Sequence, residues 1–256
     1  MFIPVSDDNP LRFIRRPYVT YAIILILLLF YAPILLNPDG QLTKEFFYGF
    51  GIIPSVVFGY NSVATEYINI PHDMTVISYI FIHANAAHIM GNLAFMFVFG
   101  DNIEDALGHM RFALFFLLTG IAGGVCHMFM NPTSVIPLVG ASGAVSGMVV
   151  AYLFLFPFVK TWGIVLSWLP LKIPTFFFLL AWILYQIIAV KFLSESNVGW
   201  WAHLGGIFSG MILVILLKRK EIKLFSRQLP VLKFPKHTIT EELEGELTQR
   251  QDKHLE

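Results

Sequence analysis

Two polar residues in otherwise apolar stretches have side chains suited to covalent catalysis. Ser142 lies in the run Gly-Ala-Ser-Gly at 140–143, and His203 lies in the run Trp-Trp-Ala-His at 200–203. A serine hydroxyl is a weak nucleophile until a neighbouring base takes its proton. The neutral imidazole of His203 can accept that proton and later return it to a leaving amine. The pair therefore predicts peptide-bond hydrolysis by a serine nucleophile.

Two further polar residues could stabilise the charge that develops in such a reaction. The tetrahedral intermediate carries a negative oxygen, which needs donors already in place. His88 and Asn92 are four residues apart and share one face of a helix, so a ring N–H and a side-chain amide could act together. Ser142 is expected at the start of a helix, where backbone N–H groups have no partner within the helix. No acidic residue is expected at the same depth to orient His203, so we predict a dyad rather than a triad.

The composition indicates that these residues lie in a membrane. Of the 256 residues, 56% are hydrophobic and only 13% are charged, and the mean hydropathy is +0.69. A soluble domain carries about 25% charged residues. The formal net charge is zero, so the chain lacks the overall basic charge that would indicate nucleic acid as a partner. The single cysteine, Cys126, excludes an internal disulfide, and no motif predicts a metal or another cofactor.

The apolar runs predict an all-α membrane protein with a six-transmembrane-helix bundle, because backbone groups in lipid must be satisfied within each segment. About 20 residues cross the hydrocarbon. The first run is too long for the apolar core of a signal peptide and is interpreted as a span. The stretch Thr161–Ile173, which contains a proline and a lysine, is interpreted as an interfacial hairpin. The six expected spans are Tyr18–Leu36, Ala86–Gly100, Arg111–Met130, Leu138–Val159, Pro174–Val190 and Gly199–Leu217.

Basic residues predict how these spans are oriented. If six spans alternate, nearly all lysine and arginine residues near their ends fall on one side, which in most membrane proteins is cytoplasmic. Both termini are then cytoplasmic, with residues 1–17 as an N-terminal segment, 18–217 as the six-span domain and 218–256 as a tail. We expect a multi-pass protein of the cell membrane, specifically a bacterial inner membrane. Ser142 and His203 then each lie about four residues into their spans from the outer side, roughly 6 Å deep.

Each of these polar residues also has an explanation that involves packing alone. A Gly-x-Ser-Gly run in a span is a small-residue packing motif, and each histidine or asparagine could be a hydrogen-bonded interior group. The small residues Ala202, Gly206 and Gly210 are expected to pack against another helix, the span at 138–159. A site is favoured because three polar clusters coincide at the outer ends of three spans, at matching depth.

Four motifs are spread over about residues 74–217. They are His83-x4-His88-x3-Asn92, Gly100-x3-Glu104-x3-Gly108, Gly140-Ala-Ser142-Gly143 and Ala202-His203-x2-Gly206-x3-Gly210. Together they resemble the rhomboid family of intramembrane serine proteases. The resemblance implies Ser142 as nucleophile, His203 as base, and His88 and Asn92 near the oxyanion. It also implies a six-helix bundle with a water-filled cavity open to the outer side, transmembrane proteins as substrates, and the fifth span as a lateral gate.

Two positions depart from the family's pattern. The Trp-Arg pair that some members carry in the first loop is absent from this chain. Some members carry a tyrosine one turn below the nucleophile, packed on the histidine. This chain has Ser146 there, so another group must orient His203.

Several other functions are compatible with parts of the sequence. The chain could be a catalytically silent protein of the same fold that binds membrane proteins or takes part in their quality control. A transporter or channel is disfavoured, because no inverted repeat and no deep acidic residue is evident. The lack of a His-Glu-x-x-His motif excludes a zinc protease, and the lack of a second intramembrane aspartate beside Asp101 excludes an aspartyl protease.

Overall fold

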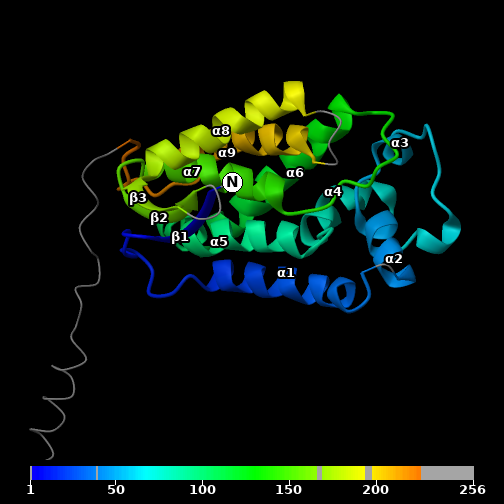
Figure 1. Ribbon diagram of the computed structural model, residues 1–256, viewed down its shortest axis with the longest axis horizontal. Helices are drawn as coiled ribbons and strands as arrows, with labels where there is room; N and C mark the ends of the chain where they lie inside the picture. Colours follow the sequence, from blue (N-terminus) through cyan, green and yellow to red (C-terminus); the bar gives the residue numbers. More distant parts are fainter. Residues whose placement is uncertain (1, 39, 166–168, 194–197, 226–256) are drawn as a thin grey trace, which may run out of the picture.

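The computed structural model describes residues 2–38, 40–165, 169–193 and 198–225, and helices dominate it. Most of the expected tail, residues 226–256, lies outside the described residues. Each of the six expected spans overlaps one helix of at least 14 residues, and Figure 1 shows most of these helices running along the long axis of the molecule. They are α1 (Tyr18–Leu36), α5 (Ala86–Leu107), α6 (His109–Met130), α7 (Ser142–Leu155), α8 (Thr175–Phe192) and α9 (Trp200–Leu217).

Shorter helices lie in the long loop between α1 and α5, which joins the first two of the expected spans. They are α2 (Gln41–Phe50), α3 (Pro54–Val57), α4 (Thr75–Ser78) and the 3-10 turns Thr65–Tyr67, His72–Met74 and Tyr79–Phe81. A backbone bridge between Ile52 and Leu138 ties this region to the segment that leads into α7. The loop is therefore attached directly to the chain that precedes Ser142.

The length and composition of the helices are those of a multi-pass membrane protein. Four of the described helices are long and apolar enough to cross the hydrocarbon, namely α1, α6, α8 and α9. Residues 72–81 and α5 form a pair bent by 74°, which makes a fifth candidate. α7 has 14 residues, so it is about 21 Å long and falls short of the hydrocarbon thickness. The number of six spans therefore stays a prediction.

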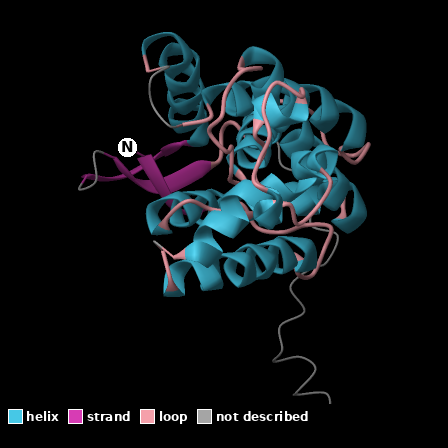
Figure 2. Ribbon diagram, turned by 90° about the vertical axis from the view of Figure 1, so that its right-hand side faces the viewer, coloured by secondary structure: helices cyan, strands magenta, loops and turns pink. Residues whose placement is uncertain are grey.

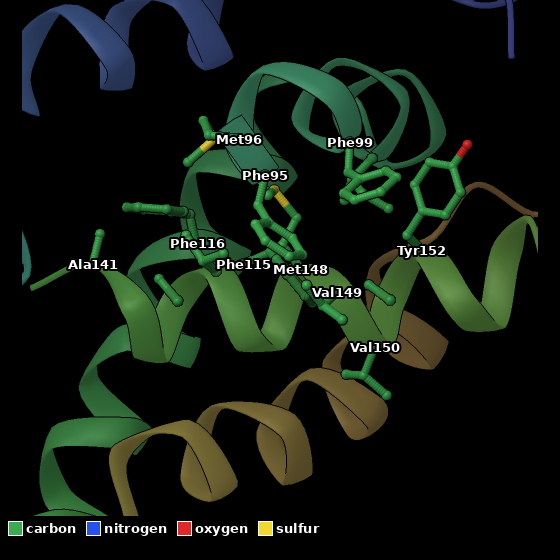
Figure 3. Packing of buried hydrophobic residues seen from close by; sticks show 14 of the residues in the cluster. Phe95, Met96, Phe99, Phe115, Phe116, Ala141, Met148, Val149, Val150 and Tyr152 are labelled. Carbon is green, nitrogen blue, oxygen red and sulfur yellow. The ribbon is translucent and has the colours of Figure 1, made fainter. Parts of the chain in front are cut away.

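α7 is enclosed by other helices. Every residue from Gly143 to Leu153 is buried. Phenylalanines of α5 and α6, including Phe95 and Phe115, pack along one flank of it (Figure 3). The helix begins only after Gly140, whose φ of +119° is incompatible with an α-helix. This turn makes α7 shorter than the apolar run from which it is predicted.

α7 and α9 approach each other closely through glycines. A Cβ on Gly206 of α9 would lie 2.0 Å from the carbonyl oxygen of Gly143 on α7. A Cβ on Gly210 would lie 2.6 Å from the Cα of Gly147. Only residues without a side chain allow two helix backbones to come this near. The expected packing of the small residues of the last span against the fourth is therefore confirmed.

A three-stranded antiparallel sheet lies at the end of the helices opposite α2 and α3 (Figure 1), and it stands to one side of them in the turned view (Figure 2). β2 (Lys160–Val165) and β3 (Leu169–Pro174) form a hairpin where the sequence predicts one. β1 (Phe2–Asp7) pairs with β2, so the prediction of an all-α chain is wrong at this end. No local pattern indicates β1, because its partner strand lies far along the chain.

The N-terminal segment is held by the last turn of α5. Asp105 accepts hydrogen bonds from the backbone N–H groups of residues 12–14 at 2.7–2.9 Å. Glu104 accepts from the N–H groups of Val19 and Thr20 at 3.0 and 2.7 Å. The first N–H groups of a helix lack hydrogen-bond partners within the helix and carry partial positive charge. A carboxylate at this position accepts their hydrogen bonds and also interacts favourably with that charge. Glu104, which belongs to one of the four motifs, thus caps α1.

Asp7, at the end of β1, is a partly buried carboxyl. The hydroxyl of Tyr152 donates a hydrogen bond to it, and the Asn102 amide lies 3.4 Å away. Burial raises the pKa of Asp7 to about 6, whereas an aspartate in an unfolded chain has a pKa of about 3.9. Between these two values the folded protein binds a proton that the unfolded chain releases. We therefore expect the free energy of unfolding to rise as the pH falls through about 6 toward about 4.

Asp7→Asn should remove this contribution, because the amide cannot titrate. Thermal unfolding of both proteins in detergent, at about pH 7.5 and about pH 5, measures the difference in its pH dependence. Asp8→Asn is the matched control, since the Asp8 carboxylate pairs with Lys172 at 2.9 Å on a more exposed part of the same sheet. An unchanged pH dependence in Asp7→Asn would contradict the assignment.

Candidate active site

The turn before α7 places Ser142 at the start of the helix. Gly140 has a positive φ, and its N–H donates to the Tyr79 carbonyl at 2.9 Å. A Cβ at this position would lie 2.5 Å from the ring of His88, so both conformation and space require glycine. Ser142 is the first residue of α7. Its hydroxyl therefore lies beside the backbone N–H groups with which a helix begins.

His203 lies opposite Ser142, on the first turn of α9. Its Nε2 is 2.9 Å from the Ser142 Oγ, and its side chain is only 8% exposed. The contact between Gly143 and Gly206 lies next to Ser142 and one turn beyond His203, so it sets the separation of the two side chains. The structure thus brings together the two residues that the sequence predicts as nucleophile and base.

The other ring nitrogen of His203 has a partner that the sequence analysis missed. Its Nδ1 is 2.7 Å from the Oε1 of Gln186, which is on α8 and only 2% exposed. Ser146 does not fill this role, because its hydroxyl donates to the Ser142 carbonyl at 2.6 Å. One sequence signal could have found Gln186: it is an uncharged polar residue inside a strongly apolar run, and such residues are usually functional.

Two tryptophan rings restrict the His203 imidazole further. The ring of Trp182, on α8, has its centroid 6.3 Å from that of His203. The ring of Trp200, one turn before His203, lies edge-on with a centroid distance of 5.6 Å. The imidazole is therefore held between aromatic side chains.

His88 and Asn92 lie on the first turns of α5, next to the turn that precedes Ser142. The ring of His88 faces the Cα of Gly140, and the Asn92 side chain is buried. The Asn92 amide nitrogen is 2.9 Å from the Nε2 of His83, which is fully buried. His83 opens the motif His83-x4-His88-x3-Asn92, from which no role for it is predicted. The structure shows that it holds Asn92.

His83 also contacts the chain beside the nucleophile. The backbone N–H of Ala141 donates to its Nε2 at 3.4 Å. Because both contacts are with donors, this nitrogen is the unprotonated one. One hydrogen of the Asn92 amide is then directed at His83, and the second is available for another acceptor. The predicted contribution of His88 and Asn92 to an oxyanion site stays a prediction.

A protein-family model described as the Rhomboid domain matches residues 72–220, which is more than half of the chain. The chain belongs to the rhomboid family. The matched region extends from just before α4 to just after α9. It contains Ser142, His203 and Gln186, whereas β1 and α1 of this rhomboid chain lie outside it.

Curated rhomboid relatives are similar at low identity. "Rhomboid-like protein 11, chloroplastic" of Arabidopsis thaliana is 28% identical over 165 residues, covering 60% of this chain and 55% of its own length. "Putative rhomboid protease YdcA" of Bacillus subtilis (strain 168) is 30% identical over 143 residues, covering 56% and 66%. "RHOMBOID-like protein 6, mitochondrial" of Arabidopsis thaliana is 30% identical over 144 residues, covering 55% and 42%. The chain thus spans between 42% and 66% of the length of these relatives.

The polar groups of this rhomboid site form two connected sets. Ser142, His203 and Gln186 form one set across α7, α9 and α8. Asn92 and His83 form the other, at the start of α5. The first set can move a proton away from the hydroxyl, and the second places an N–H donor beside the same turn. Both sets lie at the end of α7 that is opposite the sheet, because β2 follows the other end of this helix.

Proposed function

We propose that this rhomboid protein is an intramembrane serine endopeptidase that cleaves transmembrane segments of membrane proteins. The observation that carries the proposal is the 2.9 Å contact between the Ser142 Oγ and the His203 Nε2 at a partly buried site in an apolar helix bundle. A partly buried hydroxyl in hydrogen-bond contact with a buried imidazole supplies the parts of an activated nucleophile.

The proposed reaction has two halves. The Ser142 Oγ attacks the substrate carbonyl while its proton moves to the Nε2 of His203, and the imidazolium then gives that proton to the leaving amine. Water hydrolyses the resulting ester in the same way, with His203 again as base. The oxyanion of each tetrahedral intermediate would be bound by N–H groups at the start of α7, by the second Asn92 amide hydrogen and by the His88 ring.

The membrane setting supports this proposal. We propose six spans, with α5 and the enclosed α7 counted among them, and a place in the cell membrane. Basic residues lie at the end of the bundle that carries the sheet, which favours a cytoplasmic location for this end and for both termini. The site then lies toward the outer side, near the ends of α5, α7 and α9. These basic residues are Arg12, Arg15, Arg16, Arg111, Lys160, Lys172, Lys218, Arg219 and Lys220.

Labelling with a fluorophosphonate probe tests the proposed function. The probe bonds covalently to an activated serine, so mass spectrometry of the labelled protein should find it on Ser142. His203→Ala should lose the label, whereas Ser146→Ala should keep it, because that hydroxyl is engaged within α7. A folded wild-type protein that takes no label would favour the silent binding protein of the same fold, and a label on another serine would show that Ser142 is not the nucleophile.

Asn92→Ala should lower kcat roughly a hundredfold, or about 3 kcal/mol, with little change in KM. The amide would bind the charged oxygen only as it develops, so its loss raises the barrier without weakening substrate binding. His88→Ala should act similarly, and the double variant should be less than additive if both serve one oxygen.

These variants are best compared by kcat per folded molecule, together with thermal stability in detergent. If Asn92 only ties His83 to α5, its loss will lower the stability and leave kcat per folded molecule intact. That outcome would remove Asn92 from the oxyanion site.

A further inference from the structure

Gln186 is a polar residue in the middle of α8, and both atoms of its amide have partners. Its Oε1 lies 2.7 Å from the Nδ1 of His203, and its Nε2 donates to the Trp182 carbonyl at 3.3 Å. We propose that Gln186 is a positioning residue that holds His203 with its proton on Nδ1, so that Nε2 is the base facing Ser142. This inference rests on the proposed function.

The hydrogen-bond partners fix each step of this assignment. The Trp182 carbonyl can only accept, so the amide nitrogen of Gln186 must face it and the amide oxygen must face His203. Because this oxygen can only accept, Nδ1 of His203 must carry the proton. The Nε2 of a neutral imidazole then has a lone pair and accepts from the Ser142 hydroxyl. A carbonyl on α8 thus selects the tautomer on α9.

The burial of Gln186 indicates that these bonds matter. A side-chain amide at 2% exposure is destabilising unless its polar atoms are hydrogen-bonded. In a serine triad, a buried carboxylate orients the histidine and also stabilises the imidazolium. Gln186 supplies the orientation without adding a charge to an apolar bundle, where an ion would be costly. The proposed dyad therefore has a neutral third partner.

A purely structural role makes different predictions. If Gln186 only joined α8 to α9, its loss would lower stability but leave the histidine tautomer and kcat per folded molecule unchanged. If it positions His203, the loss should lower kcat about a hundredfold at constant KM, because small misplacements of a reacting group have effects of this size.

The experiment compares Gln186→Met, which keeps the length and removes the oxygen, with Gln186→Glu, which keeps an oxygen and adds charge. Ile187→Ala is the control, since this neighbouring side chain on α8 is 53% exposed. Cleavage of a single-span model substrate in detergent gives kcat, KM and the pH profile. We expect Gln186→Met to lower kcat and Ile187→Ala to leave kcat at the wild-type value. Gln186→Glu should retain part of kcat and move the acid limb of the profile to higher pH, because a carboxylate favours the imidazolium.

Nitrogen-15 NMR of histidine-labelled wild-type protein tests the tautomer without any Gln186 variant. The His203 signals are assigned by their loss in His203→Ala, and the proton should be found on Nδ1. A proton on Nε2 in the resting wild type would overturn the inference, as would wild-type kcat in folded Gln186→Met. Failure of the proposed function is recognised separately, by the absence of fluorophosphonate labelling in a wild-type protein whose His203 tautomer is as expected.

Discussion

Ser142→Ala is expected to abolish cleavage of a transmembrane substrate, and His203→Ala is expected to do the same. In serine proteases whose nucleophile and base act as a unit, either single loss lowers kcat by about a millionfold. Ser142→Ala should leave the protein folded, because Ala141 rather than Ser142 occupies the N-cap of α7, and within the part of the chain that the structure describes the hydroxyl bonds only to His203. His203→Ala should be less stable, since it leaves a cavity and removes the partner of Gln186.

Purified protein reconstituted in liposomes with a single-span substrate provides the measurement. The double variant should be no slower than either single variant, because the second change removes nothing that still functions. Ser146→Ala is the matched control, because it also deletes a serine hydroxyl, one turn further along the same buried helix. Substantial cleavage by the Ser142→Ala protein would show that another group is the nucleophile.

After the loss of Ser142 or His203, Gly206→Ala should have the largest effect, and it should lower both stability and activity. The added Cβ would lie 2.0 Å from the carbonyl oxygen of Gly143, far inside van der Waals contact, and backbone atoms cannot rotate away. Overpacking of this kind destabilises by about 3 kcal/mol. It would also push α9 away from α7, and these two helices carry His203 and Ser142. A shift of roughly 1 Å between reacting groups is enough for a hundredfold loss of rate.

The same substitution at Gly91 provides the control. Gly91 is on α5, and a Cβ added there meets no atom within 4 Å. Gly91→Ala should therefore match the wild type in thermal stability and cleavage, or be slightly more stable because alanine favours the helix. If Gly206→Ala also behaves like the wild type, the contact between α7 and α9 is looser than the structure indicates.

Local properties of the sequence are sufficient to predict the membrane character and the helices. An apolar run of sufficient length has one stable form in lipid, so Tyr18–Leu36 is predicted with the same bounds that α1 has. The same reasoning predicts Ser142 and His203 as candidate site residues, because a polar group within such a run is destabilising unless it has a function or a partner. Glycines spaced four apart predict the close helix contact that Gly206 and Gly210 make.

The sequence does not indicate how the chain turns where a helix begins. The apolar run at 138–159 does not by itself give the exact start of α7, because this depends on the positive φ of Gly140 and on its contact with His88. The N-terminal strand is a similar case. β1 forms only because β2 is presented beside it, and Asp105 then holds the next residues.

By itself, then, the sequence determines a multi-pass helical protein of the rhomboid family with a serine and a histidine near corresponding ends of two helices. Only the tertiary structure decides which side chains meet. Gln186 reaches the Nδ1 of His203 because α8 lies against α9, and Asn92 meets His83 because the chain bends before α5. A hydrogen bond depends on positions to within a few tenths of an ångström. Such positions follow from how distant segments pack, which no local pattern of residues encodes.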